Sequence, residues 1–245
     1  MFIIKYRKVF ITVSVILFAA SIALIATFGL KFGIDFRGGA QTEISYTGAR
    51  PDAEIVQASV ATLSLGEVIL QPVGESDYTI KTRDLTEPEH QALLKAMTVD
   101  GKFVSAEKSY TSIGPSIGKE LKQKAITSII LVMGAIILFI AYAFRKVSRP
   151  VSSWKYGFIA IVTLIHDIAI PTGAFALISH YSGMEIDTLF IVALLTVLGL
   201  SVSDTIVVFD RIRENIRNHN TSNFAETVGR SLSQTFTRSI NTSLT

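Results

Sequence analysis

Four long apolar stretches alternate with polar segments along the chain of 245 residues. They cover residues 9–29, 125–144, 157–178 and 188–209. The first contains 21 residues and no charge. At a rise of about 1.5 Å per residue it is about 31 Å long, which matches the thickness of a bilayer core. The pattern therefore predicts four membrane-spanning helices.

The first stretch has two interpretations, because Lys5, Arg7 and Lys8 precede it as basic residues precede a cleaved signal peptide. The apolar core of a signal peptide is shorter, roughly 7–15 residues, and ends at a site of small residues. The length of this stretch favours an uncleaved membrane anchor, with a signal peptide as the alternative.

The polar segment 31–122 contains alternating patterns. Polar and apolar side chains alternate over residues 41–46, which is the period of a half-buried strand. Residues 51–63 begin with Pro-Asp and then place apolar side chains on one helical face. The segment therefore begins with a strand followed by a helix.

The remainder of this segment continues in the same manner. Residues 68–73 and 78–82 have the composition of two strands joined by a tight turn. Thr86 and Glu89 have the spacing of a capping box at the start of a second helix. Residues 102–110 are predicted to be the last strand. The order β-α-β-β-α-β is that of a ferredoxin-like fold.

Charge is distributed unevenly along the chain. Charged residues make up only 18% of it, against 49% hydrophobic residues. Basic residues cluster before the first stretch, in the 145–155 loop and after residue 209, whereas the 179–187 loop has no Lys or Arg. By the positive-inside rule, the amino terminus is cytoplasmic and the 31–122 segment is outside. The basic residues therefore indicate membrane lipid, and no nucleic acid, as their surroundings.

The predicted fold class is a transmembrane α-helical bundle with a small extracytoplasmic α+β domain. It has four parts: a cytoplasmic amino terminus and first span (1–30), a periplasmic domain (31–122), spans two to four (123–209), and a cytoplasmic connector leading into the start of a fifth span (210–245).

Enzymatic motifs are lacking in the sequence. There is no cysteine, the four histidines are scattered without metal-ligand spacing, and no Gly-x-Ser-x-Gly motif occurs. The glycine-rich residues 33–39 lack the Gly-Lys-Ser/Thr ending of a phosphate-binding loop. We therefore predict no enzyme activity, metal site or bound cofactor, and interpret residues 33–39 as a tight link into the outer sheet.

Asp204 is the first candidate for chemistry, because it lies within the fourth apolar stretch. A carboxylate there costs a few kcal/mol and is usually paired, protonated or functional. Helical geometry puts Ser201 about 60° and Arg211 about 20° from it around the helix. The alternative is a structural carboxylate bonded to a neighbouring helix.

His166 and Asp167 are the second candidates, near the middle of the third stretch and shortly before Pro171. The two side chains could relay protons or could simply pack the helices together. Neighbouring residues on a helix point about 100° apart, so we do not expect them to bond to each other.

Arg238 is the third candidate, at the entry of a further span. Its guanidinium could neutralise a buried carboxylate, although an interfacial arginine with no such role is the favoured interpretation from the sequence.

Five motifs in this order resemble the SecF-type subunits of the SecD/SecF protein-export family. They cover residues 33–39, 113–118, 164–167, 203–215 and 233–245. The resemblance extends over the whole chain. It departs from the family at Ser203 and Ser233, where Asn is common.

The resemblance implies a place in the resistance-nodulation-division superfamily and in the bacterial inner membrane. It implies SecD as the other half of a pair, attachment to the SecYEG channel, YajC as a further partner, and unfolded preproteins as cargo moved by the proton-motive force. The family has six spans, so this chain would lack two of them.

The resemblance also implies site residues. Asp204 matches the family's proton-pathway aspartate and Arg238 its partner arginine, and we add Asp167 and His166 to this pathway. The supporting motif comprises Ser201, Ser203, Thr205, Asp210 and Arg211. Protons are the expected coupling ion and sodium the alternative. A small-molecule exporter of the same superfamily and a non-transporting scaffold subunit remain alternative functions.

Overall fold

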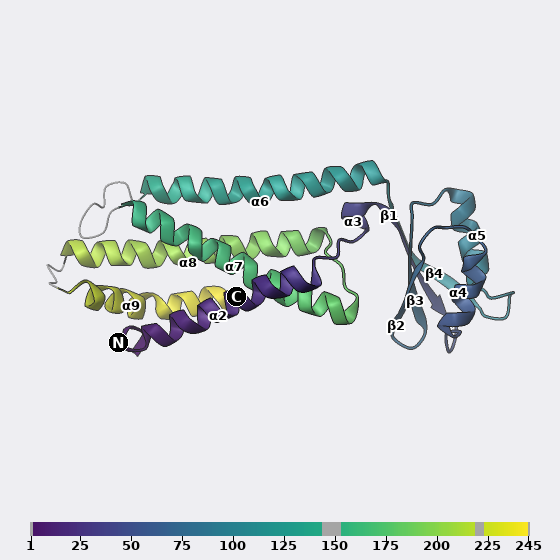
Figure 1. Ribbon diagram of the computed structural model, residues 1–245, viewed down its shortest axis with the longest axis horizontal. Coiled ribbons are helices and arrows are strands. Elements are labelled where there is room, and N and C mark those ends of the chain that lie inside the picture. The colour runs from purple at the N-terminus through teal and green to yellow at the C-terminus, as the bar shows by residue number, and fades with distance from the viewer. Residues whose placement is uncertain (1, 144–152, 219–222, 245) are drawn as a thin grey trace. The chain divides into compact units, whose positions relative to one another are not determined.

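The computed structural model describes residues 2–143, 153–218 and 223–244 (Figure 1). The chain forms two compact units. The α+β unit comprises residues 32–125, and the helical unit comprises residues 1–31 and 126–245. The basic residues expected at 145–149 lie outside the described residues.

The α+β unit is an antiparallel sheet in the order β2-β3-β1-β4. In chain order its elements are α3 (Ile34–Arg37), β1 (Gly39–Tyr46), α4 (Ala53–Ala61), β2 (Ile69–Val73), β3 (Asp77–Thr82), α5 (Glu87–Met97) and β4 (Ser105–Ile113). Figure 1 shows α4 and α5 together on one face of this sheet. Apart from the added turn of α3, this is the β-α-β-β-α-β order predicted from the sequence, and the ferredoxin-like fold is confirmed.

The core of the α+β unit lies between the sheet and its two helices. Ile44 of β1 and Ile80 of β3 pack with Val56 of α4 and Leu93 of α5, and all four are almost fully buried. The hydroxyl of Tyr46 donates a hydrogen bond of 2.9 Å to the carbonyl of Met97. Burial, followed by the charge of nearby Tyr78, raises the pKa of Tyr46 to about 12, so this tyrosine stays neutral.

The capping box predicted at the start of α5 is confirmed. Both the backbone N–H and the hydroxyl of Thr86 donate to Glu89 Oε2, at 2.9 and 2.8 Å. The prediction for the last strand was three residues too early. Val99, Asp100 and Gly101 have positive φ, so the chain turns there and β4 begins only at Ser105.

The helical unit is built from long apolar helices. They are α1 (Phe2–Lys5), α2 (Arg7–Phe28), α6 (Pro115–Ala143, whose first turns belong to the α+β unit), α7 (Ser153–Ser182), α8 (Thr188–Asn218) and α9 (Phe224–Leu244). Within the described residues four of them, α2, α6, α7 and α8, are long and apolar enough to cross a membrane. The four predicted spans are confirmed, and the chain is a multi-pass membrane protein.

The helices of this unit pack through small residues and a few buried side chains. α2 lies along α7, where Ser21 of α2 is buried against Gly173. A second cluster joins α6, α7 and α8 through Ile140, Tyr156 and Phe209. Many other large apolar side chains are exposed, as expected for helices that face lipid.

Candidate functional site

Three helices contribute polar side chains to one hydrogen-bonded chain inside the helical unit. Ser14 of α2 lies with its Oγ 2.7 Å from Nε2 of His166 on α7. The other ring nitrogen of His166, Nδ1, lies 3.0 Å from Oδ1 of Asp167. Ser201 of α8 donates a hydrogen bond to Oδ2 of the same carboxylate. We call these four residues the serine-histidine-aspartate chain.

The contact between His166 and Asp167 contradicts our expectation that neighbours on a helix would not bond. Their Cβ atoms do point in different directions. However, Nδ1 and Oδ1 each lie only two bonds beyond Cβ, so rotation about the side-chain bonds brings them together. Pro171 contributes to this region, because a proline has no N–H to donate to the carbonyl of Asp167 one turn earlier.

Asp204 lies one turn beyond Ser201 on α8 and is half-buried. The hydroxyl of Ser201 donates its hydrogen bond to Asp167 on α7. Within residues 2–143, 153–218 and 223–244, no hydrogen bond or ion pair reaches the Asp204 carboxylate. A carboxylate in an apolar helix without such a partner is costly to ionise.

The other charges of the same motif are paired with one another. Arg211 Nη1 lies 2.7 Å from Glu214 Oε2, and Arg213 Nη2 lies 3.6 Å from Asp210 Oδ1. Arg211 therefore forms its ion pair with Glu214 and not with Asp204, although the sequence places Arg211 and Asp204 on one face of the helix. Ser203 is exposed and Thr205 is half-buried.

Arg238 lies on α9, which packs against α8. Its side chain is exposed and lines a cavity of about 290 Å³, which Ile206, Val207 and Asp210 also line. No hydrogen bond or ion pair between Arg238 and Asp204 is found in the described part of the chain. The structure thus brings Arg238 close to residues that follow Asp204 and not into contact with Asp204 itself.

Two polar residues of the helical unit were not selected from the sequence. Ser14 is a single hydroxyl within the first apolar stretch, and only its contact with His166 reveals it. Asn215 is buried between α8 and α9, where its Nδ2 donates to Ser231 Oγ at 2.8 Å and to Gln234 Oε1 at 3.0 Å. The signal available in the sequence for Asn215 was an uncharged amide among the many charged residues that follow residue 209.

The glycine-rich link of residues 33–39 is explained by close backbone approaches. Gly38 has a φ of +79°, and a Cβ there would lie 2.7 Å from Pro115 Cα. A Cβ on Gly39 would lie 2.7 Å from the carbonyl oxygen of Thr82, and one on Gly118 would lie 2.6 Å from the Gly38 nitrogen. These glycines let the link pack closely against Thr82 and the beginning of α6. The sequence predicted a tight link from the first span into the sheet, but not its contact with α6.

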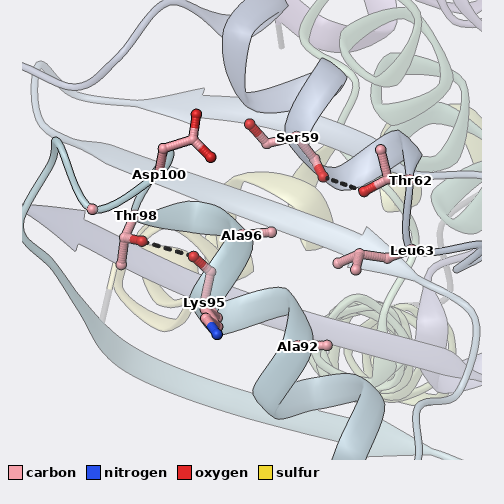
Figure 2. Close-up of a pocket in the computed structure, with 9 residues that line it drawn as sticks. Ser59, Thr62, Leu63, Ala92, Lys95, Ala96, Thr98 and Asp100 are labelled. Carbon is pink, nitrogen blue, oxygen red and sulfur yellow. Dashed lines mark hydrogen bonds between the residues drawn. The ribbon is translucent and has the colours of Figure 1, made fainter.

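The α+β unit has a larger cavity of about 790 Å³ between α4 and α5 (Figure 2). Figure 2 shows Ser59 and Leu63 on one side and Ala92 and Lys95 on the other. Its charged lining residues, Lys95 and Asp100, are exposed to solvent. Throughout the residues that the structure describes, no group of three or more His, Asp or Glu side chains is arranged to hold a metal.

These features define a multi-pass membrane protein with a ferredoxin-like unit after its first span and polar side chains joined between its spans. Residues 93–245 match the family model "Protein export membrane protein SecD/SecF, C-terminal", and residues 23–49 match the "SecD/SecF GG Motif". The chain belongs to the SecD/SecF family of protein-export membrane proteins.

Individual relatives agree with this assignment. The chain is 36% identical to the protein translocase subunit SecF of Thermobaculum terrenum, over 99% of this chain and 79% of that protein. It is 31% identical to the protein translocase subunit SecDF of Bacillus subtilis, over 98% of this chain and 31% of that protein.

A solved structure gives the same result. The crystal structure of SecDF, a translocon-associated membrane protein from Thermus thermophilus, covers 100% of this chain with a TM-score of 0.82 at 26% identity. The chain spans 32% of that protein's length. The two SecDF proteins are thus about three times as long as this chain.

Proposed function

We propose that this chain acts with SecD, at the SecYEG channel, as a subunit that uses the proton-motive force to promote export of unfolded preproteins. The single observation that carries the proposal is the position of Asp204 and the lack of a charged partner for it among the described residues. Asp204 is a half-buried carboxylate in an apolar helix, and every other charge of its motif from 210 to 214 is paired elsewhere.

A carboxylate in that position is suited to carrying a proton. A carboxyl group can bind a proton and release it again, and inside an apolar helix this change adds or removes a charge that water does not screen. One proton crossing 100 mV releases about 2.3 kcal/mol. Loss of its charge would change how α8 packs, which is a local switch of the kind that drives larger movements.

Arg238 is proposed as the counter-charge that Asp204 meets in another state of the protein. The support is its place on α9, where it lines the same cavity as Ile206 and Val207 of α8. These two residues lie two and three positions after Asp204. His166 and Asp167 are proposed as further members of the pathway, since their hydrogen-bonded chain ends at Ser201 one turn from Asp204.

The test uses the full-length protein assembled with SecD in inverted membrane vesicles. We expect Asp204→Asn to abolish the stimulation of preprotein translocation by a proton gradient while assembly with SecD stays intact. Glu226→Gln is the matched control, because Glu226 is an exposed carboxylate in the first turn of α9, in the same helical unit but outside the motif. Full stimulation in the Asp204→Asn protein would refute the proposal.

The same vesicles distinguish the coupling ion. We expect a proton gradient alone to stimulate translocation, and a sodium gradient without a pH gradient to leave it unchanged. YajC is proposed as a further partner and would be tested by copurification with the same assembly.

We propose the bacterial inner membrane as the location, with the amino terminus in the cytoplasm. Lys5 precedes α2, Arg7 and Lys8 are its first two residues, and Arg217 lies at the end of α8, whereas the 179–187 loop lacks Lys and Arg. Because the chain has no cysteine, single cysteines can report sidedness. We expect a membrane-impermeant maleimide added to intact spheroplasts to label Tyr181→Cys and not Arg217→Cys.

A further inference from the structure

The serine-histidine-aspartate chain links three helices, and the donors and acceptors along it can be assigned. Ser201 donates to one oxygen of Asp167, and the imidazole Nδ1 lies at hydrogen-bond distance from the other oxygen. The contact between Nδ1 and Oδ1 can be made by an N–H donating to the carboxylate or by a protonated carboxyl donating to the ring nitrogen. We assign the hydrogen to His166 Nδ1 and the negative charge to Asp167, because a carboxyl group ordinarily gives up its proton at lower pH than an imidazole does.

This assignment leaves the second ring nitrogen as the site where protonation changes. In the neutral ring, Nε2 has a lone pair and accepts the O–H of Ser14 across the 2.7 Å contact. When one proton binds at Nε2, the new N–H donates to Ser14 Oγ and the serine O–H turns to another acceptor. The charge of the His166–Asp167 pair then changes from −1 to 0.

Ser14 is suited to this exchange because a hydroxyl both donates and accepts. In a helix a serine hydroxyl can donate to the carbonyl four residues earlier, so the heavy atoms can remain where they are in both states. Phe18, one turn after Ser14 on α2, stacks on the imidazole with ring centroids 6.2 Å apart and holds the ring from the same helix. The first span thus positions the ring with two side chains.

We infer that His166 is a second proton-binding group, that Asp167 remains its ionised counter-charge, and that Ser14 and Ser201 are positioning residues for the pair. This inference rests on the proposed function and extends it to the first span, which carries no charge between residues 9 and 29. It makes the direction of the hydrogen bond between α2 and α7 depend on the protonation of His166.

The charged surroundings of His166 are simple. Along α2 the nearest charges are Arg7 and Lys8, about two turns before Ser14, and both are exposed. Along α8 the nearest titratable group is Asp204, one turn after Ser201. Residues 125–143 of α6 contain no Asp, Glu, Lys, Arg or His. Asp167 is therefore the charged group in direct contact with His166. Asp204, one turn after Ser201 on α8, is the next nearest titratable group among these helices.

A direct experiment is ¹⁵N NMR of the full-length protein with labelled histidine, titrated in nanodiscs. We expect the signal of His166 to show hydrogen at Nδ1 and none at Nε2 at high pH, and to gain a proton at Nε2 as the pH falls. Ser14→Ala should move the midpoint to lower pH by about one unit. The hydrogen bond between Ser14 and the protonated ring is stronger than the one to the neutral ring, so its loss destabilises the protonated form more.

Two variants serve as matched controls. Ser14→Thr keeps a hydroxyl and should restore the midpoint. Ser21→Ala removes a hydroxyl from the same helix that bonds only to the carbonyl of Leu17 in its own helix, and should leave the midpoint unchanged. Asp167→Asn should lower the midpoint further than Ser14→Ala does, because it removes the counter-charge.

Export measurements separate this inference from the proposed function. We expect His166→Gln to lose proton-driven export at least tenfold, and Ser14→Ala to shift the pH at which export is half-maximal in the direction of the NMR midpoint. If Asp204→Asn abolishes coupling while His166 shows no protonation change and Ser14→Ala behaves as wild type, this inference is overturned and the proposed function stands.

Discussion

Gly173 of α7 approaches Ser21 of α2 so closely that a Cβ at position 173 would fall 2.5 Å from both the Cα and the Cβ of Ser21. The two residues form the closest helix-to-helix approach among the glycines of the described chain. In lipid, where helices are not driven together by water, such contacts between small residues supply much of the attraction. The same pair of helices carries the contact between Ser14 and His166.

We predict that Gly173→Ala separates α2 from α7. The added methyl group meets backbone atoms that cannot turn away, and overpacking of this kind costs about 1–3 kcal/mol. The ring of Phe28 stacks on that of His180 with centroids 4.3 Å apart, so cysteines at these two positions report the separation. We expect slower disulfide crosslinking between them in the Gly173→Ala protein.

Gly199→Ala is the control for this experiment, since no described atom lies within 4 Å of a Cβ at that position of α8. It should leave crosslinking between α2 and α7 unchanged. Equal crosslinking rates in both variants and the wild type would contradict the importance of the Gly173 contact.

A second prediction concerns the glycine link of the α+β unit. Gly38→Ala should loosen the junction between β1 and the start of α6, because the methyl group meets Pro115 at 2.7 Å and φ is +79°. The expected cost is about 2–4 kcal/mol from strain and overpacking together. Amide hydrogen exchange of β1 and β4 peptides in the full-length protein should rise accordingly.

Gly48→Ala separates the two causes. Gly48 also has a positive φ, of +108°, but among the described residues beyond its chain neighbours no atom lies within 4 Å of its Cβ position. This variant should accelerate exchange only slightly. If it accelerates exchange as much as Gly38→Ala does, backbone strain and not the contact with Pro115 is the main effect.

The α+β fold could be predicted from the sequence because its signals are local. Alternating side chains at 41–46, the capping box of Thr86 and Glu89, and the turn before β3 each involve residues close together in the chain. The start of β4 could not be predicted, since Val99 and Asp100 adopt positive φ against their usual preference. Tertiary packing imposes that turn, and no local pattern marks it.

The candidate site was predictable only in part for the same reason. A charge in an apolar stretch is visible in the sequence, so Asp167 and Asp204 were selected. Which groups meet depends on how the helices pack, so Ser14 was not selected, and the bond between Ser201 and Asp167 was not predicted. The helical wheel describes one helix at a time, whereas these contacts join three.

A third prediction concerns acid stability of the α+β unit. Hydrogen bonds from Arg83, and then from Thr86, lower the pKa of Glu89 from 4.5 to about 2. A carboxylate whose pKa is lowered on folding stabilises the fold fully above its unfolded value, and this contribution is lost as the pH falls through the folded value. We therefore expect stability to fall between about pH 4.5 and pH 2.

Glu89→Gln should weaken this dependence, because the side chain no longer titrates. The measurement is the urea midpoint of the full-length protein, followed by NMR methyl signals of Leu93 and Met97 in the core beside α5. Glu87→Gln, on the same exposed turn, is the control and should keep the acid dependence of the wild type. An unchanged acid dependence in Glu89→Gln would show that other groups cause it.

The last prediction concerns the buried amide that joins α8 to α9. Asn215 donates to Ser231 and to Gln234, whereas Ser231 also donates to the carbonyl of Thr227 within α9. Asn215→Ala therefore removes the link between the helices while the hydroxyl of Ser231 keeps a partner. Losing buried hydrogen bonds of this kind costs about 1–3 kcal/mol, which corresponds to a rise of about 5-fold to 150-fold in local opening.

We expect hydrogen exchange of α9 amides to rise by that factor in the Asn215→Ala protein, with α2 and α7 unaffected. Asn218→Ala, at the exposed end of α8, is the matched control and should exchange as the wild type does. Because Arg238 lies on α9, a loosened α9 should also weaken proton-driven export even though Asn215 has no charge to lose. If α9 exchange rises while export is unchanged, the position of Arg238 does not matter for coupling, and its proposed role as the counter-charge of Asp204 is wrong.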